Sequence, residues 1–325
     1  MNENSSISFA DAPRSLLPDV SRLAVAMGIF DGVHLGHQAI ITALREVSQE
    51  TGATPVALFF SPHPREVLGF GTPQILTTPA HKARLLLAAG AERLVCVRFT
   101  RELSELAPET FLEKFFVADG MTVTAFCVGS NWRFGHENSG DASMLTAWAE
   151  SRSMRCVIVP QVCHGGTPIC STRIRASIEA GDLDDAARML GRRFSVNGIV
   201  KHGNGIAGGS LDCPTANICE SNHALPPFGV YAARAYWNGH SDDGIVYVGE
   251  APTIRDDNIP LIEMHLFNVA EDLYGVDMTV EFHSFLRKSM KFESVPKLEA
   301  QIRQDIAAAR QCLANTSAQH YFTTP

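Results

Sequence analysis

The sequence is short of positive charge. Its 325 residues carry 27 Lys and Arg against 35 Asp and Glu, which gives a formal net charge of -8 at pH 7. Nucleic-acid backbones are bound through clustered Lys and Arg, so this balance argues against a general nucleic-acid binder. Any affinity for phosphate must therefore be local.

Long apolar runs are also missing. The most apolar region, residues 85–97, is interrupted by Gly90, Glu92 and Arg93, so no stretch is suited to span a bilayer. Residues 1–15 are polar and lack the apolar segment of a secretory signal. We therefore expect a cytoplasmic protein whose partners are small molecules and not membranes.

Paired cysteine motifs are absent as well. The cysteines, at positions 96, 127, 156, 163, 170, 213, 219 and 312, include no Cys-x-x-Cys pair. Most of these cysteines lie in segments that look buried. We interpret them as small core residues in a reducing compartment.

The first part of the chain has the pattern of an α/β fold. A chain of this length exceeds the usual size of a single core, which predicts two domains. Up to about residue 190, short apolar strands alternate with amphipathic helices, as is typical of a parallel sheet covered on both faces. The predicted strands are 23–27, 55–60, 94–99, 123–128 and 155–159, and the predicted helices are 37–50, 80–89, 108–117, 141–152 and 172–190.

The pattern changes from about residue 194. Runs rich in Val, Ile and Tyr are bounded by Gly, Asn, Asp and Pro, which predicts short antiparallel strands. The predicted strands are 194–201, 230–237, 244–248, 261–267 and 277–282, and a helix is predicted at 295–313. These elements indicate a small closed β-barrel with one covering helix. With a boundary near Gly191, the two predicted domains are 1–190 and 191–325.

The most informative stretch is residues 28–37, Gly-Ile-Phe-Asp-Gly-Val-His-Leu-Gly-His. It follows an apolar strand and opens an amphipathic helix, so His34 and His37 stand three residues apart at a helix start. Backbone N–H groups and the helix dipole attract anions there, and two imidazoles add donors. We predict a phosphate site, with Asp31 capping the helix or the turn. A zinc pair or two surface histidines are the alternatives, but no nearby Cys or third His completes a zinc site.

Two other segments stand out, and the first of them suits phosphate chemistry. Residues 170–175, Cys-Ser-Thr-Arg-Ile-Arg, precede a helix and combine hydroxyls with two guanidiniums, which suits a polyphosphate. A helix cap with surface arginines is the alternative. Residues 128–135, Val-Gly-Ser-Asn-Trp-Arg-Phe-Gly, form a glycine-bounded aromatic loop, whose alternative interpretation is an ordinary turn with buried aromatic side chains.

These motifs, in this order, resemble those of the prokaryotic bifunctional riboflavin kinase/FMN adenylyltransferases, the FAD synthetases. The His-x-Gly-His signature at 34–37 is that of the nucleotidyltransferase superfamily, and Pro-Thr-Ala-Asn at 214–217 is the flavokinase motif. The similarity runs from about residue 22 to about residue 313. It implies a Rossmann-like nucleotidyltransferase domain followed by a riboflavin-kinase-like barrel. It also implies ATP, Mg²⁺ and flavins as ligands.

For the first domain, the resemblance implies adenylyl transfer from ATP to FMN, giving FAD and pyrophosphate. His34 and His37 would stabilise the transition state. The residues it implies for binding ATP and phosphate are Gly28, Phe30, Asp31, Gly36, Asn131, Ser171, Thr172 and Arg175.

For the second domain, the resemblance implies ATP-dependent phosphorylation of riboflavin, with Glu263 as the general base. The implied Mg²⁺ ligands are Thr215 and Asn217. The residues implied for nucleotide and flavin binding are Gly203, Gly208, Asn217, Tyr274 and Arg287.

Two departures from the family pattern concern the kinase. Residues 208–213 read Gly-Gly-Ser-Leu-Asp-Cys where the family usually has Gly-Arg-x-Leu-Gly-Phe, and Ala251 stands where an arginine is common. Without the arginine, and with Asp212 adding negative charge, nucleotide binding would be weakened. In one alternative the chain is therefore an adenylyltransferase only, and the barrel is a structural or flavin-sensing module. A non-enzymatic flavin-binding or regulatory protein is another alternative, against which the intact motifs at 34–37 and 171–175 weigh. A transferase for another phosphorylated acceptor is a third, but it leaves the second domain unexplained.

Overall fold

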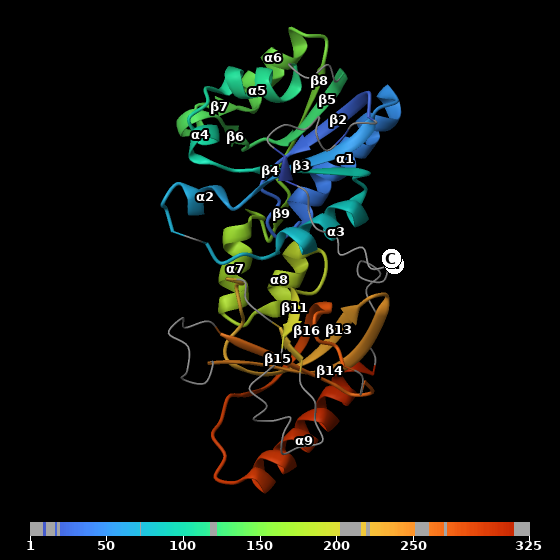
Figure 1. Ribbon diagram of the computed structural model, residues 1–325, viewed down its shortest axis with the longest axis vertical. Coiled ribbons are helices and arrows are strands. Elements are labelled where there is room, and N and C mark those ends of the chain that lie inside the picture. The colour runs from blue at the N-terminus through green and yellow to red at the C-terminus, as the bar shows by residue number, and fades with distance from the viewer. Residues whose placement is uncertain are drawn as a thin grey trace. The chain divides into compact units, whose positions relative to one another are not determined.

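The computed structural model describes residues 9–10, 17, 20–71, 73–117, 122–201, 216–218, 222–250, 260–269 and 272–314. They form two compact units (Figure 1). The first unit contains the residues up to 73 together with 79–171, and the second contains 74–78 together with the residues from 172 onward. None of the helices in these ranges is long and apolar enough to cross a membrane. The predicted division of activities at Gly191 stays a prediction.

The first unit is built on a parallel sheet in the order β1-β4-β3-β2-β5-β8. Its strands are β1 (Phe9–Ala10), β2 (Arg22–Met27), β3 (Thr54–Ser61), β4 (Arg93–Arg98), β5 (Thr122–Gly129) and β8 (Arg155–Val159). The central strand β2 is buried on both faces, which explains its unbroken apolar sequence. All five strands predicted for this part are confirmed to within a residue or so.

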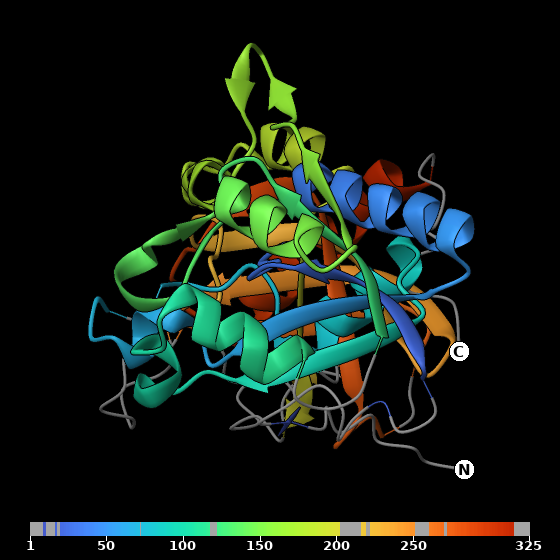
Figure 2. The same ribbon diagram turned by 90° about the horizontal axis from the view of Figure 1, so that it is seen from above.

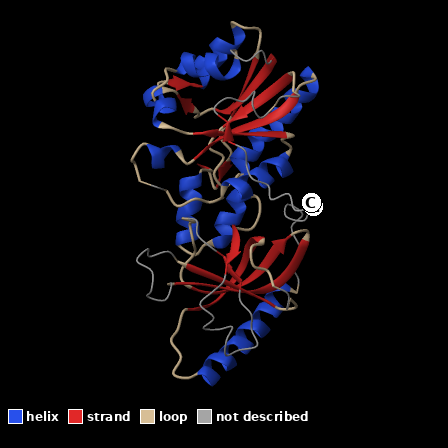
Figure 3. Ribbon diagram, in the orientation of Figure 1, coloured by secondary structure: helices blue, strands red, loops and turns tan. Residues whose placement is uncertain are grey.

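Helices cover both faces of this sheet (Figure 3). The helices are α1 (Leu35–Thr51), α2 (Pro64–Val67), α3 (Pro79–Ala89), α4 (Arg101–Ser104), α5 (Pro108–Phe116) and α6 (Ala142–Glu150). α5 and α6 pack on the face presented by Leu23, Val25 and Met27. The alternate residues Ala24 and Ala26 are fully buried on the opposite face, where α1 packs on β2. The predicted α/β class is confirmed.

Two short ladders extend the first unit. β6 (Arg133–Phe134) pairs with β7 (Gly140–Asp141), and β9 (Cys163–His164) pairs with β10 (Thr167–Pro168). Seen from above in Figure 2, the β9–β10 hairpin stands clear of the sheet. Neither ladder was predicted, because two-residue strands leave no periodicity in a sequence.

The predicted single helix at 172–190 is wrong. The structure has two helices there, α7 (Ser171–Glu179) and α8 (Leu183–Leu190). Gly181 interrupts them with φ of 82°, a backbone conformation that glycine adopts readily. The Asp182 side chain then caps α8 by accepting from the Asp185 N–H at 2.9 Å. The amphipathic pattern of the two helices is continuous in the sequence, which hid the break.

The second unit contains a closed antiparallel barrel in the order β11-β12-β15-β14-β13-β16. Its strands are β11 (Ser195–Lys201), β12 (Ala216–Ile218), β13 (Gly229–Trp237), β14 (His240–Gly249), β15 (Leu261–Leu266) and β16 (Asp277–Lys288). The predicted closed barrel is confirmed. The predicted end of the last strand at 282 is wrong, because β16 continues past two irregularities in its pairing with β13.

One helix, α9 (Val295–Leu313), covers part of the outer face of the barrel, as predicted. Its Ala309 and Leu313 pack against Val230, Ala232 and Ile245 of the barrel wall. Inside the barrel, the alternate strand positions are apolar and almost fully buried. They include Val196, Ala233, Val246, Met264 and Val280.

The prediction that the cysteines are core residues is correct only in part. Cys96 and Cys127 are buried, and burial raises the pKa of their thiols to about 11 and about 12. Cys163, Cys170 and Cys312 are exposed, so the core interpretation is wrong for these three.

Candidate functional sites

The first candidate site lies where the strand order of the parallel sheet reverses. β3 and β4 follow β2 on one side, whereas β5 and β8 lie on its other side. Ligands of open α/β sheets bind outside the carboxyl ends of the strands at such a point. The loop 28–34 follows β2 and the loop 130–132 follows β5, so the predicted phosphate segment and the predicted aromatic loop both lie at this edge.

The loop 28–34 has an unusual backbone. Phe30, Gly32 and Val33 have φ of 51°, 85° and 42°, and non-glycine residues rarely adopt such values. Burial holds this conformation, since Phe30 is 0% exposed and its ring lies over Gly28. A Cβ at Gly28 would stand 3.1 Å from that ring. Strained backbone of this kind often occurs at ligand sites.

The two histidines of the motif lie against each other. Their rings stack with centroids 3.6 Å apart and planes 17° apart, and the ring of Phe30 meets His37 edge-on at 5.2 Å. His34 is the N-cap of α1, and its Nδ1 accepts from the His37 N–H at 3.4 Å. Because Nδ1 is an acceptor, neutral His34 carries its proton on Nε2. A Cβ at Gly36 would stand 3.1 Å from the His34 ring, which explains the glycine between them.

Asp31 is buried, at 3% exposure, and it does not cap α1. Its backbone carbonyl accepts from the Ser171 Oγ at 2.9 Å, and both residues belong to the first unit. Asn131 is exposed after β5, and its Oδ1 would stand 3.2 Å from a Cβ at Gly129. The structure thus collects the residues predicted around His34 in the first unit.

Two predicted ATP ligands belong to the second unit. Thr172 and Arg175 lie in α7, beyond the last residue of the first unit. The Arg175 Nε donates to the Gln74 carbonyl at 2.5 Å. Their role in binding the phosphates of ATP stays a prediction.

Sequence reasoning missed Lys82. This side chain lies on α3 and is 6% exposed, and its Nζ donates to the Ile29 carbonyl at 2.8 Å. Burial lowers its pKa, while the charge of Asp31 acts in the opposite direction. Three basic residues, His81, Lys82 and Arg84, lie close together in this helix. Nothing in their pattern marks the one that reaches the loop.

The second candidate site is a row of side chains across four strands of the barrel. Asn217 of β12 is paired with Glu263 of β15, and Glu263 is paired with Tyr247 of β14. On the other side, Asn217 is paired with Lys201 of β11. Directly opposite residues of antiparallel strands share a face, and the alternate positions point into the barrel. The register therefore places Lys201, Asn217, Glu263 and Tyr247 side by side on the outer face.

Glu263 occupies the middle of this row. Desolvation by burial raises the pKa of its carboxyl above the ordinary value. A carboxylate that is partly withdrawn from water is a stronger base than an exposed one, which suits proton abstraction. Lys201 was missed in the sequence, because it is distant from Asn217 along the chain and only the strand register brings them together.

Several predicted kinase residues lie outside the described part of the chain. They are Gly203, Gly208 and Thr215. Ala251, which stands where an arginine is common in the family, also lies outside the described residues. Tyr274 is 43% exposed, and its N–H donates to the Asp272 Oδ1 at 2.9 Å. Its predicted contact with flavin stays a prediction.

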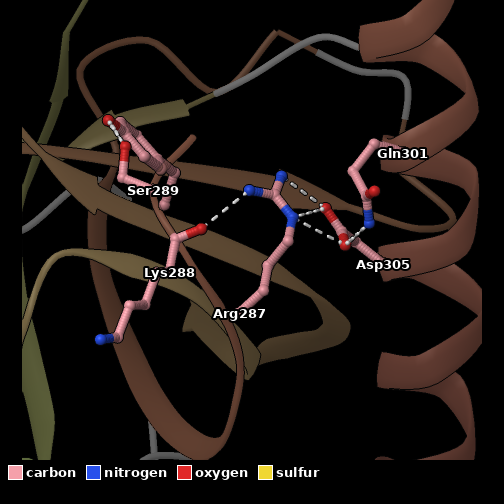
Figure 4. Close-up of polar contacts among 6 residues, drawn as sticks. Arg287, Lys288, Ser289, Gln301 and Asp305 are labelled. Carbon is pink, nitrogen blue, oxygen red and sulfur yellow. Dashed lines mark hydrogen bonds and ion pairs between the residues drawn. The ribbon is translucent and has the colours of Figure 1, made fainter. Parts of the chain in front are cut away.

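Arg287 forms a clamp between β16 and α9. Figure 4 shows its guanidinium against the carboxylate of Asp305, with Nη2 to Oδ2 at 2.8 Å and Nε at 3.0 Å from both oxygens. Its Nη1 donates to the Lys288 carbonyl at 3.1 Å, and Gln301 donates to Asp305 at 2.9 Å. Asp305 is 4% exposed, so its carboxylate is shielded from water. The structure thus gives Arg287 a structural role beside its predicted role in binding.

This clamp leads to a prediction on stability. We expect Arg287→Met to lower the free energy of unfolding of the second unit by about 3 kcal/mol, because it leaves a buried carboxylate without its cation. Urea unfolding followed by circular dichroism measures the change. Lys297→Met is the matched control, since Lys297 pairs with Glu293 in the open, and it should cost at most about 0.5 kcal/mol. Equal effects of the two substitutions would contradict the clamp.

Within the part of the chain that the structure describes, no group of three or more His, Cys, Asp or Glu side chains could hold a metal ion. Mg²⁺ does not need such a group, since it is usually held by one or two protein oxygens together with substrate phosphates.

Comparisons with known proteins cover both units. Residues 17–173 match the family model of FAD synthetase, and residues 190–313 match that of riboflavin kinase. A Pseudomonas fluorescens protein named bifunctional riboflavin kinase/FMN adenylyltransferase is 35% identical over 305 residues, 92% of this chain and 96% of that protein. A Bacillus subtilis protein of the same name is 31% identical over 300 residues, 91% and 94% of the two chains.

A solved structure gives a similar result for the fold. A crystal structure described as a macrolide-efflux protein from Streptococcus pneumoniae superposes with a TM-score of 0.76 at 26% identity. The match covers 92% of this chain and 97% of that one. The similarity thus extends over nearly the full length of the proteins on each side.

Proposed function

The chain belongs to the family of bifunctional riboflavin kinases/FMN adenylyltransferases, and from that membership we propose that it makes FAD in two steps, one in each unit. The second unit phosphorylates riboflavin to FMN, and the first unit transfers an adenylyl group from ATP to FMN. The observation that carries the proposal is the stacked pair of His34 and His37 at the start of α1, at the reversal point of the parallel sheet.

Adenylyl transfer needs no nucleophile from the protein. A phosphate oxygen of FMN attacks the α-phosphorus of ATP, and the bond to the bridging oxygen breaks as pyrophosphate leaves. Catalysis then depends on positioning and on neutralising the oxygens of the transferred group. We assign that role to His34 and His37, with the backbone N–H groups at the start of α1. Ser171 is the proposed partner of the remaining phosphates within the first unit.

Riboflavin phosphorylation requires a base instead. Glu263 takes the proton of the riboflavin 5′-hydroxyl while that oxygen attacks the γ-phosphorus of ATP, and ADP leaves. The raised pKa of Glu263 supports this role, because a general base works best with a pKa closer to the working pH. We assign Lys201, in the same row, to the phosphates of the nucleotide.

The kinase row also fits Mg²⁺. Asn217 stands directly opposite Glu263 on neighbouring strands, so an amide oxygen and a carboxylate share one face. Oxygen donors of this kind suit Mg²⁺, which would supply charge neutralisation at the phosphates of ATP. Asn217 and Thr215 are the proposed ligands. Glu263 is assigned to proton abstraction and is not a proposed ligand of Mg²⁺.

The raised pKa of Glu263 predicts the pH dependence of the kinase. The base must be ionised, so FMN formation should fall as the pH decreases through the raised pKa, which lies above the ordinary value of 4.5. We expect kcat/KM for riboflavin to show an acid limb displaced upward from that value. FAD formation from FMN, measured in the same samples, should lack this limb. A kinase rate that stays constant down to the ordinary carboxyl range would contradict the assignment.

A direct assay tests the proposed function. Purified protein is incubated with ATP, Mg²⁺ and either riboflavin or FMN, and the flavins are resolved by chromatography. We expect riboflavin to give FMN and FAD, and FMN to give FAD. If riboflavin stays unchanged while FMN gives FAD, the chain is an adenylyltransferase with a structural or flavin-sensing barrel. If neither flavin reacts, the proposal fails.

A further inference from the structure

Resting on the proposed adenylyl transfer, we infer that Lys82 is a positioning residue for that reaction: it holds the peptide group between Ile29 and Phe30 and so fixes the ring that supports His37. Lys82 comes from α3, which is separate in sequence from the histidine motif. The inference rests on the contacts of Lys82 within the first unit.

The Lys82 ammonium is aimed at the loop from inside the protein. Its Nζ donates to the Ile29 carbonyl at 2.8 Å and lies 5.3 Å from the centroid of the Phe59 ring. The side chain is 6% exposed. Charged donors make shorter and stronger hydrogen bonds than neutral ones, and low exposure increases the effect. A buried lysine without such a task would be costly to keep.

The bonded carbonyl belongs to Ile29. Among the loop residues that have a side chain, Ile29 is the one whose side chain is not buried. Phe30, Asp31, Val33 and His34 are all at most 5% exposed, whereas Ile29 is 38% exposed. Packing therefore does not fix the position of Ile29. The bond from Lys82 does so through the backbone.

That peptide group precedes a strained residue. Phe30 has φ of 51°, and this angle is measured from the plane of the Ile29–Phe30 peptide. If the peptide were free to rotate, Phe30 could relax toward the favoured negative φ region. Its ring would then leave the edge-on contact with His37 at 5.2 Å. By holding the carbonyl, Lys82 keeps the Phe30 ring and thereby the His37 ring in place.

Lys82 also interacts with the same loop electrostatically, through Asp31. Asp31 is 3% exposed, and its charge acts on Lys82. Cys96 is the other titratable group that acts on Lys82, and the thiol is neutral at physiological pH because burial raises its pKa to about 11. Removing Lys82 alone therefore leaves the Asp31 carboxylate buried without this cation, and a test must separate that cost from the loss of positioning.

The test uses Lys82→Met, which keeps most of the length of the side chain but removes the donor and the charge. Lys114→Met is the matched control, because Lys114 is exposed on α5. We expect Lys82→Met to lower kcat for FAD formation by ~10²-fold, the effect of a small misplacement of a catalytic group. KM for FMN and ATP should change little, and FMN formation by the second unit should be unaffected.

Several outcomes of this test would overturn the inference. Unchanged FAD formation by folded Lys82→Met protein would overturn the inference, and so would a loss confined to KM or a parallel loss of both activities. If Lys82→Met does not fold, Asp31→Asn/Lys82→Met is compared with Asp31→Asn by the same criteria, since neither carries an unbalanced carboxylate. If the double variant also fails to fold, Lys82 serves folding only and the inference is wrong.

A second readout does not depend on activity. In protein labelled at histidine, Lys82→Met should shift the NMR signal of the His37 ring and leave that of His240, exposed on β14, in place. An unmoved His37 signal would overturn the inference. If the wild-type protein formed no FAD, the proposed function would fail, and Lys82 would be judged by this signal alone.

Discussion

The His37→Ala protein should form FAD ~10² to 10³ times more slowly than the wild type, the usual cost of losing one donor to a transition-state oxygen. FMN formation from riboflavin should continue at the normal rate, because His37 lies in the first unit and the kinase row lies in the second. Chromatographic resolution of FMN and FAD in a single reaction measures both rates at once.

The fold should survive this change. His37 is only partly buried, and the cap of α1 comes from His34, so removing the His37 ring leaves the helix start intact. His240→Ala is the control, since it removes an exposed imidazole outside either site. FAD synthesis by His37→Ala at a rate close to that of His240→Ala would remove the histidine pair from the mechanism.

Glu263→Gln should have the complementary effect. Loss of a general base typically costs ~10² to 10⁴-fold in rate, so FMN formation should fall by that order while FMN is still converted to FAD. Glu179→Gln, at the exposed end of α7, is the control for removing a carboxylate from the second unit. If Glu263→Gln phosphorylates riboflavin as fast as this control does, another group is the base.

The same substitution has a predicted effect on stability, and its sign follows from the pKa. The folded state holds the proton of Glu263 more tightly than the unfolded state does, because burial raises the pKa above 4.5. Stability is therefore gained as the pH falls through the folded pKa, and the ionised carboxylate is unfavourable at neutral pH. Glu263→Gln should thus not lower the Tm near pH 7. Lost kinase activity in a protein of unchanged Tm would separate catalysis from folding.

The sequence was sufficient for the architecture because apolar periodicity determines which faces are buried. Five parallel strands, a closed barrel and its covering helix were all predicted from this pattern. The break at Gly181 was not, since a single glycine in a continuous amphipathic pattern does not by itself predict a helix end. Two-residue strands such as β6 and β9 carry no periodicity at all.

For the sites, the sequence identified residues whose local motif is distinctive. His34, Gly36 and His37 fall in one short segment, and their mutual geometry follows from helix spacing. Lys82 and Lys201 were missed because their relation to a site is made by tertiary structure. The first reaches a loop from another helix, and the second meets Asn217 only through the strand register.

The division of the chain into units has a practical consequence for separating the two activities. The chain passes between the units at 73/74, 78/79 and 171/172, because the short segment 74–78 belongs with the barrel. Within that unit, Ile75 bonds to the backbone of Asn222 and Ala224, and Thr78 bonds to Asn197. A single cut at 171/172 thus leaves these five residues on the fragment that lacks their partners, whereas a single cut at 73/74 leaves residues 79–171 of the first unit on the fragment of the second. Truncation at one codon therefore gives no fragment that holds one whole unit and nothing of the other.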